Sequence, residues 1–209
     1  MKKLRLPQLE TARKDPVSFA RQLSLDAGAS GFGHSKFMDW QRAAFKYLDS
    51  KDLIEARQHL ELSFRAHFKV DRRNVLDLER YVQILEEFTR EQRRKRLVFV
   101  ESRKNVDFPL VKEKLRLTGQ VPTIFMNSSS GYSIYFMTKS SIEWQNELRF
   151  PFVQYYFSKK VYGVDIKDVE VGIFNLETRG FEEKSYSNYA VNKALSEIRG
   201  LGRSIADNL

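Results

Sequence analysis

The sequence contains no cysteine, which excludes disulfides, thiolate-bound metals and cysteine nucleophiles. It has no run of eighteen apolar residues that could form a transmembrane helix, and the basic segment 1–15 is not followed by the apolar core of a signal peptide. It also lacks a P-loop, a dinucleotide-binding glycine motif, a G-x-S-x-G motif and a zinc-ligand pattern. We therefore expect a cytoplasmic protein that has no membrane partner and no resident cofactor.

Positive charge is what the sequence has in excess. The 209 residues include 36 lysines and arginines against 27 aspartates and glutamates, which gives a formal net charge of +9. A basic surface attracts nucleic acid, anionic lipid or an acidic protein, and phosphate is the commonest target. The densest cluster, at 90–96, allows two interpretations: a phosphate-contacting group, or a solvated helix end whose cations complement the helix dipole.

The first half of the chain, residues 1–94, is expected to be a helical region. Apolar residues recur there at intervals of three and four, which is the spacing of one helix face. Pro16 is well placed in the first turn of a short helix. The predicted helices cover 16–23, 35–48, 53–68 and 75–88, the last of them capped by Asn74.

The second half, residues 95–209, is expected to be mixed α/β. Two apolar runs flank the polar turn Asn127–Gly131, which predicts a β-hairpin over 119–139. Further strands are predicted at 96–101, 113–118 and 168–175, with an edge strand over 180–186; helices are predicted from the capping box at Ser140, from Pro151 to Tyr162 with Gly163 as the stop, and from Ser187 to the stop signals Gly200 and Gly202. The predicted fold is therefore α+β, a helical half followed by a small mixed sheet flanked by helices, folded as one compact unit.

The predicted hairpin ends in Lys139, and five segments of the chain match one known pattern. They are 9–23 with its proline and phenylalanine, Gly33-His34 at a helix start, the glycine-led strand 117–122, the strand 135–139, and the aromatic helix 149–163 followed by the strand 169–175. With the order of the elements, they resemble a RecB-type member of the PD-(D/E)XK nuclease superfamily. The resemblance implies a restriction-endonuclease-like core, a nucleic-acid ligand and a functional lysine at Lys139.

The same resemblance exposes a missing metal site. Its first aspartate would stand at Pro122 and its second acid at Met137, and neither side chain binds a cation. Phosphodiester hydrolysis in this superfamily depends on Mg²⁺ or Mn²⁺ held by oxygen ligands. The expected protein is therefore a pseudo-nuclease that keeps the fold without the chemistry.

Other residues could rebuild a metal site. Glu143 and Glu147 are four residues apart on the helix expected after the hairpin, so both could face one side, and His34 could add an imidazole. The simpler interpretation makes the glutamates a helix cap and a solvated residue, and gives His34 a packing role. His59 and His67 are assigned to packing or surface, because no acid completes a zinc pattern with them.

Lys139 has two interpretations as well, a point charge for a phosphate or a solvated strand end. On the helix 149–163, most aromatic residues must be core, which leaves a glutamine and one tyrosine free to meet a DNA backbone or stack on a base. The nucleic-acid contacts that we expect are Arg93, Arg94, Lys95, Arg96, Lys139, Arg149, Gln154, Lys159 and Lys160.

Three functions follow, in order of preference. The first is an inactive, nuclease-like module that binds a nucleic-acid backbone, DNA in preference to RNA, in a process such as recombination or replication. The second is a scaffold in a larger nucleoprotein, replication or defence assembly, whose basic surface meets an acidic protein. The third is a divergent nuclease with Mg²⁺ or Mn²⁺ that uses Glu143, Glu147, His34 and Lys139.

Overall fold

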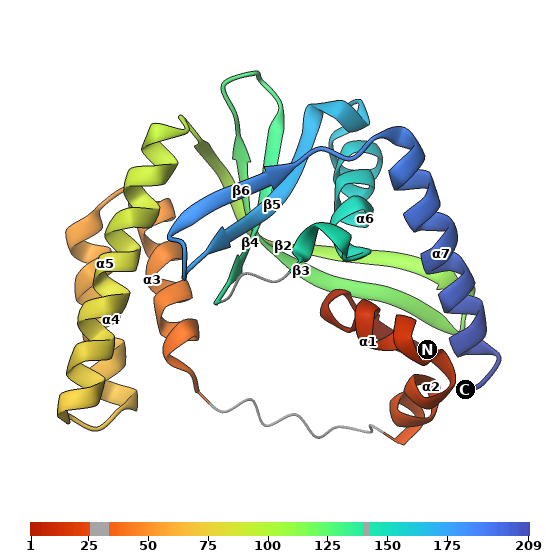
Figure 1. Ribbon diagram of the computed structural model, residues 1–209, viewed down its shortest axis with the longest axis horizontal. Coiled ribbons are helices and arrows are strands. Elements are labelled where there is room, and N and C mark those ends of the chain that lie inside the picture. The colour runs from red at the N-terminus through yellow and green to blue at the C-terminus, as the bar shows by residue number, and fades with distance from the viewer. Residues whose placement is uncertain (26–33, 140–142) are drawn as a thin grey trace.

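The computed structural model describes residues 1–25, 34–139 and 143–209 (Figure 1). Its helices and strands confirm the expected α+β class. In chain order the elements are β1 (Lys2–Arg5), η1 (Leu6–Gln8), α1 (Leu9–Lys14), α2 (Pro16–Leu25), α3 (Lys36–Ser50), α4 (Leu53–His67), α5 (Arg72–Arg94), β2 (Val98–Val111), β3 (Leu115–Met126), β4 (Tyr132–Thr138), η2 (Trp144–Asn146), α6 (Arg149–Tyr156), the π-helical turn η3 (Phe157–Tyr162), η4 (Ile166–Asp168), β5 (Val169–Asn175), β6 (Gly180–Lys184) and α7 (Asn188–Ala206).

The strands of the described chain form one mixed sheet around β3. β2 pairs antiparallel with β3 along its length, while the other edge of β3 is shared by β1 at its start and β4 at its end. β5 then adds parallel to β4, and β6 closes the sheet antiparallel to β5. Gly119 lies where the chain leaving β1 crosses β3, and a Cβ there would come within 2.7 Å of the Leu6 side chain. Glycine is therefore required for this close approach.

The expected hairpin is confirmed by β3, β4 and their turn. The Asn127 side chain holds the turn, because its Oδ1 accepts hydrogen bonds from the backbone N–H groups of Ser129 at 3.1 Å and Gly131 at 3.0 Å. This is the local hydrogen bonding that makes asparagine a turn residue. Hydrogen bonds within a few residues therefore account for the turn.

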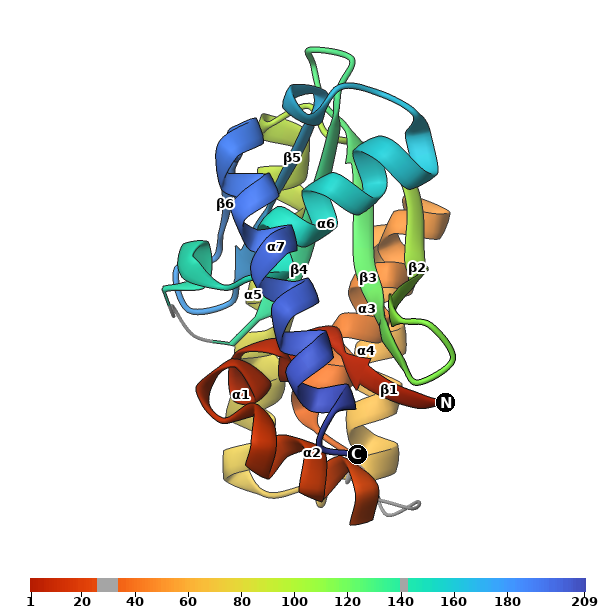
Figure 2. The ribbon, with the colours of Figure 1, turned by 90° about the vertical axis from the view of Figure 1, so that its right-hand side faces the viewer.

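Helices cover both faces of the sheet, and two hydrophobic clusters fill the layers between them (Figures 1 and 2). Successive side chains of β4 point to opposite faces of the sheet and so enter different clusters. Ile134 and Phe136 belong to the cluster with α1, α2, α6 and α7, whereas Tyr135 and Met137 belong to the cluster with α3, α4 and α5. Residues 1–25 thus pack with α7 and supply strand β1, and α3–α5 alone form the separate helical layer. The helical region expected over 1–94 is divided between the two faces.

Several element boundaries differ from the expectation. Asp71, not Asn74, caps α5 by accepting the Asn74 N–H at 2.8 Å. α7 continues through Gly200 and Gly202 to Ala206, because a buried apolar stripe holds the helix beyond these residues and Gly202 packs on Leu110. Strand β1 was not expected, since four residues of mixed polarity carry no strand signal.

Three other boundaries agree with the expectation. Pro151 lies in the first turn of α6, where its missing N–H costs nothing, and Gly163 ends η3 with a φ of 68°. Ser187 caps α7 by accepting the Ala190 N–H at 3.2 Å.

Among the described helices, none combines the length and the apolar character that a membrane crossing requires.

Candidate nucleic-acid interface and metal-binding residues

The residues expected at the nuclease-like centre lie at the ends of β3 and β4. Lys139 directly follows β4, is exposed, and places its Nζ 5.5 Å from the centre of the Phe37 ring on α3. Met137 is buried between the sheet and α3–α5, and Pro122 is half-buried on β3. Neither strand contains an acidic residue, so β3 and β4 supply no carboxylate ligand beside Lys139.

The helix expected to align Glu143 with Glu147 is not present in the described residues. The short 3-10 turn η2 stands there, and the backbone of Glu147 is extended. One reason is tertiary, because the Leu148 N–H donates to Glu10 Oε1 on α1 at 2.7 Å instead of closing a helical turn. The Glu147 carboxylate pairs with the Arg149 Nε at 2.6 Å, and burial raises the pKa of Glu147. The prediction that both glutamates share one helical side is wrong.

The basic cluster at the end of α5 is divided between paired and exposed cations. Arg94 pairs with Glu91 at 2.7 Å, and Lys95 pairs with Glu183 of β6 at 2.5 Å. Arg93 and Arg96 are exposed, with no carboxylate partner among the described residues. Arg96 has a φ of 52° as the chain turns toward β2. This cluster therefore offers two free cations rather than four.

The four residues expected on the helix 149–163 do not share a surface. Arg149 stacks on the rings of Phe136 and Phe150, with its guanidinium carbon about 5 Å from each centre. Lys159 donates to the Val164 carbonyl at 3.0 Å, and Lys160 is exposed.

Gln154 corrects the expectation most clearly. It is fully buried, and its Nε2 donates to the carbonyls of Ile166 and Tyr186, while its Oε1 accepts the Tyr186 N–H at 2.8 Å. The side chain ties α6 to η4 and to the segment before α7. Gln154 cannot contact DNA because it faces the protein interior on every side.

A basic hollow, which the sequence did not predict, lies on the α3–α5 side of the molecule. It has a volume of about 400 Å³. Its charged and polar walls come from three separate elements. They are Arg42, Lys46 and Asp49 of α3, His59 of α4, and Ser102 and Arg103 of β2.

The geometry of α3 and β2 explains why these side chains converge. Arg42, Lys46 and Asp49 are spaced by four and three residues and therefore share one helix face. Arg103 lies at an irregularity of β2, where its φ is 56°, and its guanidinium carbon lies 4.7 Å from the Phe45 ring centre. Lys46 also pairs with Glu55 at 2.8 Å, which raises the pKa of its ammonium. The hollow is thus a concave surface with several cations and one lining acid.

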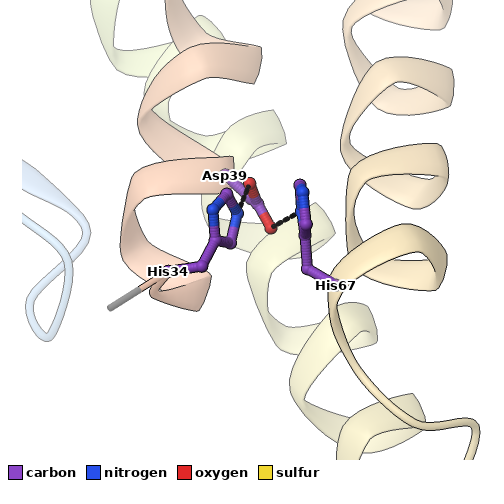
Figure 3. A group of neighbouring side chains, drawn as sticks. All are labelled: His34, Asp39 and His67. Atoms are coloured by element: carbon purple, nitrogen blue, oxygen red, sulfur yellow. Dashed lines mark hydrogen bonds and ion pairs between the residues drawn. The ribbon is translucent and has the colours of Figure 1, made fainter. Parts of the chain in front are cut away.

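A second group brings together Asp39 of α3, His67 of α4 and His34, which precedes α3. His34 Nε2 lies 2.6 Å from one oxygen of Asp39, and His67 Nδ1 lies 3.4 Å from the other (Figure 3). Asp39 is fully buried, while both imidazoles reach the surface. The simpler expectation for His34 and His67 was packing or surface, and the acid that joins them was missed. These are the described residues whose positions suit a metal ion.

Comparisons with known proteins identify no family. No protein-family model and no curated protein matches the chain. Among solved structures, a crystal structure described as that of SSO0001 aligns with 92% of this chain and 85% of that chain, at 10% sequence identity and a TM-score of 0.31. At that TM-score, nothing about function follows from the likeness.

Proposed function

We propose that this protein binds a nucleic-acid backbone, DNA in preference to RNA, through the basic hollow between α3, α4 and β2. The observation that carries the proposal is the convergence of Arg42, Lys46 and Arg103 on one concave surface of about 400 Å³. Cations held at fixed positions on a concave surface concentrate the positive potential there and attract phosphate. The resemblance to a nuclease fold stays part of this proposal, because it also implies a nucleic-acid ligand.

Two further features support a backbone ligand. The net charge of +9 favours any polyanion, and Arg93, Arg96 and Lys139 are exposed cations outside the hollow. Arginine suits phosphate because its planar fork donates two parallel hydrogen bonds. A contact of this kind positions the backbone without reading bases, so the expected binding is sensitive to salt and nearly independent of sequence.

The experiment measures the affinity of the protein for labelled oligonucleotides over a range of salt concentrations. Single- and double-stranded DNA and RNA of equal length separate the ligand classes, and Arg103→Gln removes one cation of the hollow. Losing one phosphate contact should lower the slope of log affinity against log salt by about 1. Arg199→Gln is the matched control, because it removes an equal charge from an exposed position on α7, on the other side of the sheet. Equal losses in both variants would show that net charge alone, and not the hollow, binds DNA.

A metal-dependent nuclease is the less favoured alternative, and it is tested in the same samples. The glutamate pair on which it depended is not on one helical side, and β3 and β4 lack acids. We expect no cleavage with Mg²⁺ or Mn²⁺. Cleavage that requires Mn²⁺ and disappears in Lys139→Ala would replace binding by catalysis as the function.

An apolar groove favours the scaffold function as a second candidate. The groove lies between the end of α4 and the start of α5, has a volume of about 410 Å³, and includes Val70, which is 84% exposed. Arg65 and Lys69 lie at its margin, so its chemistry suits an acidic amphipathic helix of a partner protein. A synthetic acidic amphipathic peptide should bind the wild type and the Val98→Asp control but not Val70→Asp. Oligonucleotide binding without peptide binding would exclude this second function.

A further inference from the structure

The group formed by His34, Asp39 and His67 connects the start of α3 with the end of α4 (Figure 3). One ligand-type atom from each residue can be chosen so that all three lie within 4.8 Å of one another. Asp39 belongs to the first turn of α3, His34 precedes that helix, and His67 is the last residue of α4. The two imidazoles therefore approach one carboxylate at the open end of the helical hairpin, one from each helix.

Burial of the Asp39 carboxylate carries the largest desolvation cost in the group. Asp39 has no exposed surface, and an ionised carboxylate taken out of water needs compensating positive charge. Arg42 lies 3.6 Å from one Asp39 oxygen, which is longer than a hydrogen bond, and its side chain is 43% exposed. Most of the compensation must therefore come from the direction of the histidines.

The two imidazoles lie close enough together to share one partner. The rings of His34 and His67 have centres 3.5 Å apart and planes inclined by 35°. An imidazole nitrogen can ligate a metal ion. A single divalent cation would serve both rings and the Asp39 carboxylate at once.

One observed separation matches metal coordination, and the other requires a small movement. Bonds of about 2.0 to 2.2 Å in a tetrahedral site place neighbouring ligand atoms about 3.3 to 3.6 Å apart. His67 Nδ1 lies 3.4 Å from one Asp39 oxygen, whereas His34 Nε2, which lies 2.6 Å from the other oxygen, must move away by about 1 Å. His34 precedes the first residue of α3, so its backbone is not fixed by helical hydrogen bonds.

The donor set identifies the class of metal. Two imidazole nitrogens and one carboxylate suit zinc and its first-row neighbours, whereas magnesium and calcium prefer all-oxygen ligands. The His34 and His67 side chains are 28% and 36% exposed, so water can reach the position left by three protein ligands. Arg42 beside Asp39 and the Phe68 ring beside both imidazoles complete the surroundings.

We propose that His34, Asp39 and His67 bind one divalent transition-metal ion of the zinc class, with water at the remaining position. The ion joins the start of α3 to the end of α4 and stabilises this helical hairpin. The proposal is independent of nucleic-acid binding, because its ligands are other residues and its readout is metal binding by the protein alone.

The test is a calorimetric titration of the metal-free protein with Zn²⁺, repeated with Mg²⁺ and followed by the visible absorption of the Co²⁺ form. We expect one equivalent of Zn²⁺, no comparable binding of Mg²⁺, and a rise in melting temperature with Zn²⁺. His67→Gln should weaken Zn²⁺ binding at least 100-fold, because a ligand is lost at an exposed helix end where folding is not at risk. His59→Gln is the matched control, since it removes an exposed histidine two turns earlier on α4 and outside the group.

Three outcomes would overturn the proposal. The first is the absence of saturable Zn²⁺ binding by the wild-type protein. The second is an equal loss of affinity in His67→Gln and His59→Gln, which would assign binding to scattered surface histidines. The third is a melting temperature that depends on His34 and on pH but not on Zn²⁺, which would make the group a protonated histidine–aspartate pair. Asp39→Asn, with circular dichroism as the folding check, gives an independent measurement of the same ligand set.

Discussion

Replacing Gln154 by leucine should destabilise the protein more than any exposed glutamine replacement, because its amide links three parts of the chain. In the wild type, Nε2 donates to the Ile166 carbonyl at 2.9 Å and the Tyr186 carbonyl at 3.2 Å, and Oε1 accepts the Tyr186 N–H at 2.8 Å. Leucine has a similar size and satisfies none of these groups. An unsatisfied buried polar group costs about 1 to 3 kcal/mol, and the apolar side chain regains part of that by burial. We expect a net loss of about 2 to 4 kcal/mol in the free energy of unfolding.

Chemical denaturation measures that loss, and calorimetry should show a melting temperature lower by about 5 to 15 °C for a chain of this size. Gln83→Leu is the matched control, since Gln83 is an exposed residue in the middle of α5 and should change stability by less than about 0.5 kcal/mol. DNA affinity of Gln154→Leu, measured below its melting temperature, should equal that of the wild type. A loss under 1 kcal/mol with an unchanged denaturant slope would refute the view that these hydrogen bonds stabilise the fold.

Three more predictions concern glycine, capping and pH. Gly172→Ala should lower the free energy of unfolding by more than about 3 kcal/mol in urea denaturation, because a Cβ would lie 1.9 Å from a carbonyl oxygen of β6. Gly200 has open space around it, so Gly200→Ala should be neutral or stabilising by up to about 1 kcal/mol. Asp71→Ala removes the cap of α5 and should cost about 1 kcal/mol by the same assay; no loss would mean that solvent replaces the cap fully. Burial raises the folded-state pKa of Glu147, so the folded state binds more protons than the unfolded state. The stability of the protein should therefore fall as pH rises from the unfolded pKa, near 4.3, through the raised folded-state value. Glu147→Gln should flatten this part of the pH–stability curve, and an unchanged curve would contradict the shift.

Local features of the sequence were the predictable part of the fold. The turn at Asn127 and the cap at Ser187 form hydrogen bonds within a few residues, so their signals are complete in a short window. Helix boundaries that depend on distant packing were predicted less well, as the continuation of α7 past Gly202 shows.

Gln154 shows why a surface role could not be separated from a core role by residue type. Glutamine is usually exposed, and the prediction followed that preference. The neighbouring residues held the contrary signal, because 150–153 reads Phe-Pro-Phe-Val and every one of these residues is buried. Gln154 follows these residues directly and is buried with them.

The basic hollow and the histidine–aspartate group could not be predicted, for a different reason. Arg103 and Arg42 are about sixty residues apart in sequence and come together only in the folded chain, where both line the hollow. Asp39 and His67 meet only because α3 and α4 pair as a hairpin. Neither set has a spacing that a linear motif could record.

Arg42 lines the hollow and also lies beside the histidine–aspartate group, and this has a thermodynamic consequence. Its guanidinium lies 3.6 Å from Asp39 and also forms part of the wall of the hollow. A metal ion on Asp39 would take over the neutralisation of that carboxylate and release Arg42 toward a phosphate in the hollow. The two ligands would then bind with positive cooperativity, and the factor by which zinc strengthens DNA binding must equal the factor by which DNA strengthens zinc binding. One arginine on one helix would thus make each ligand a sensor for the other.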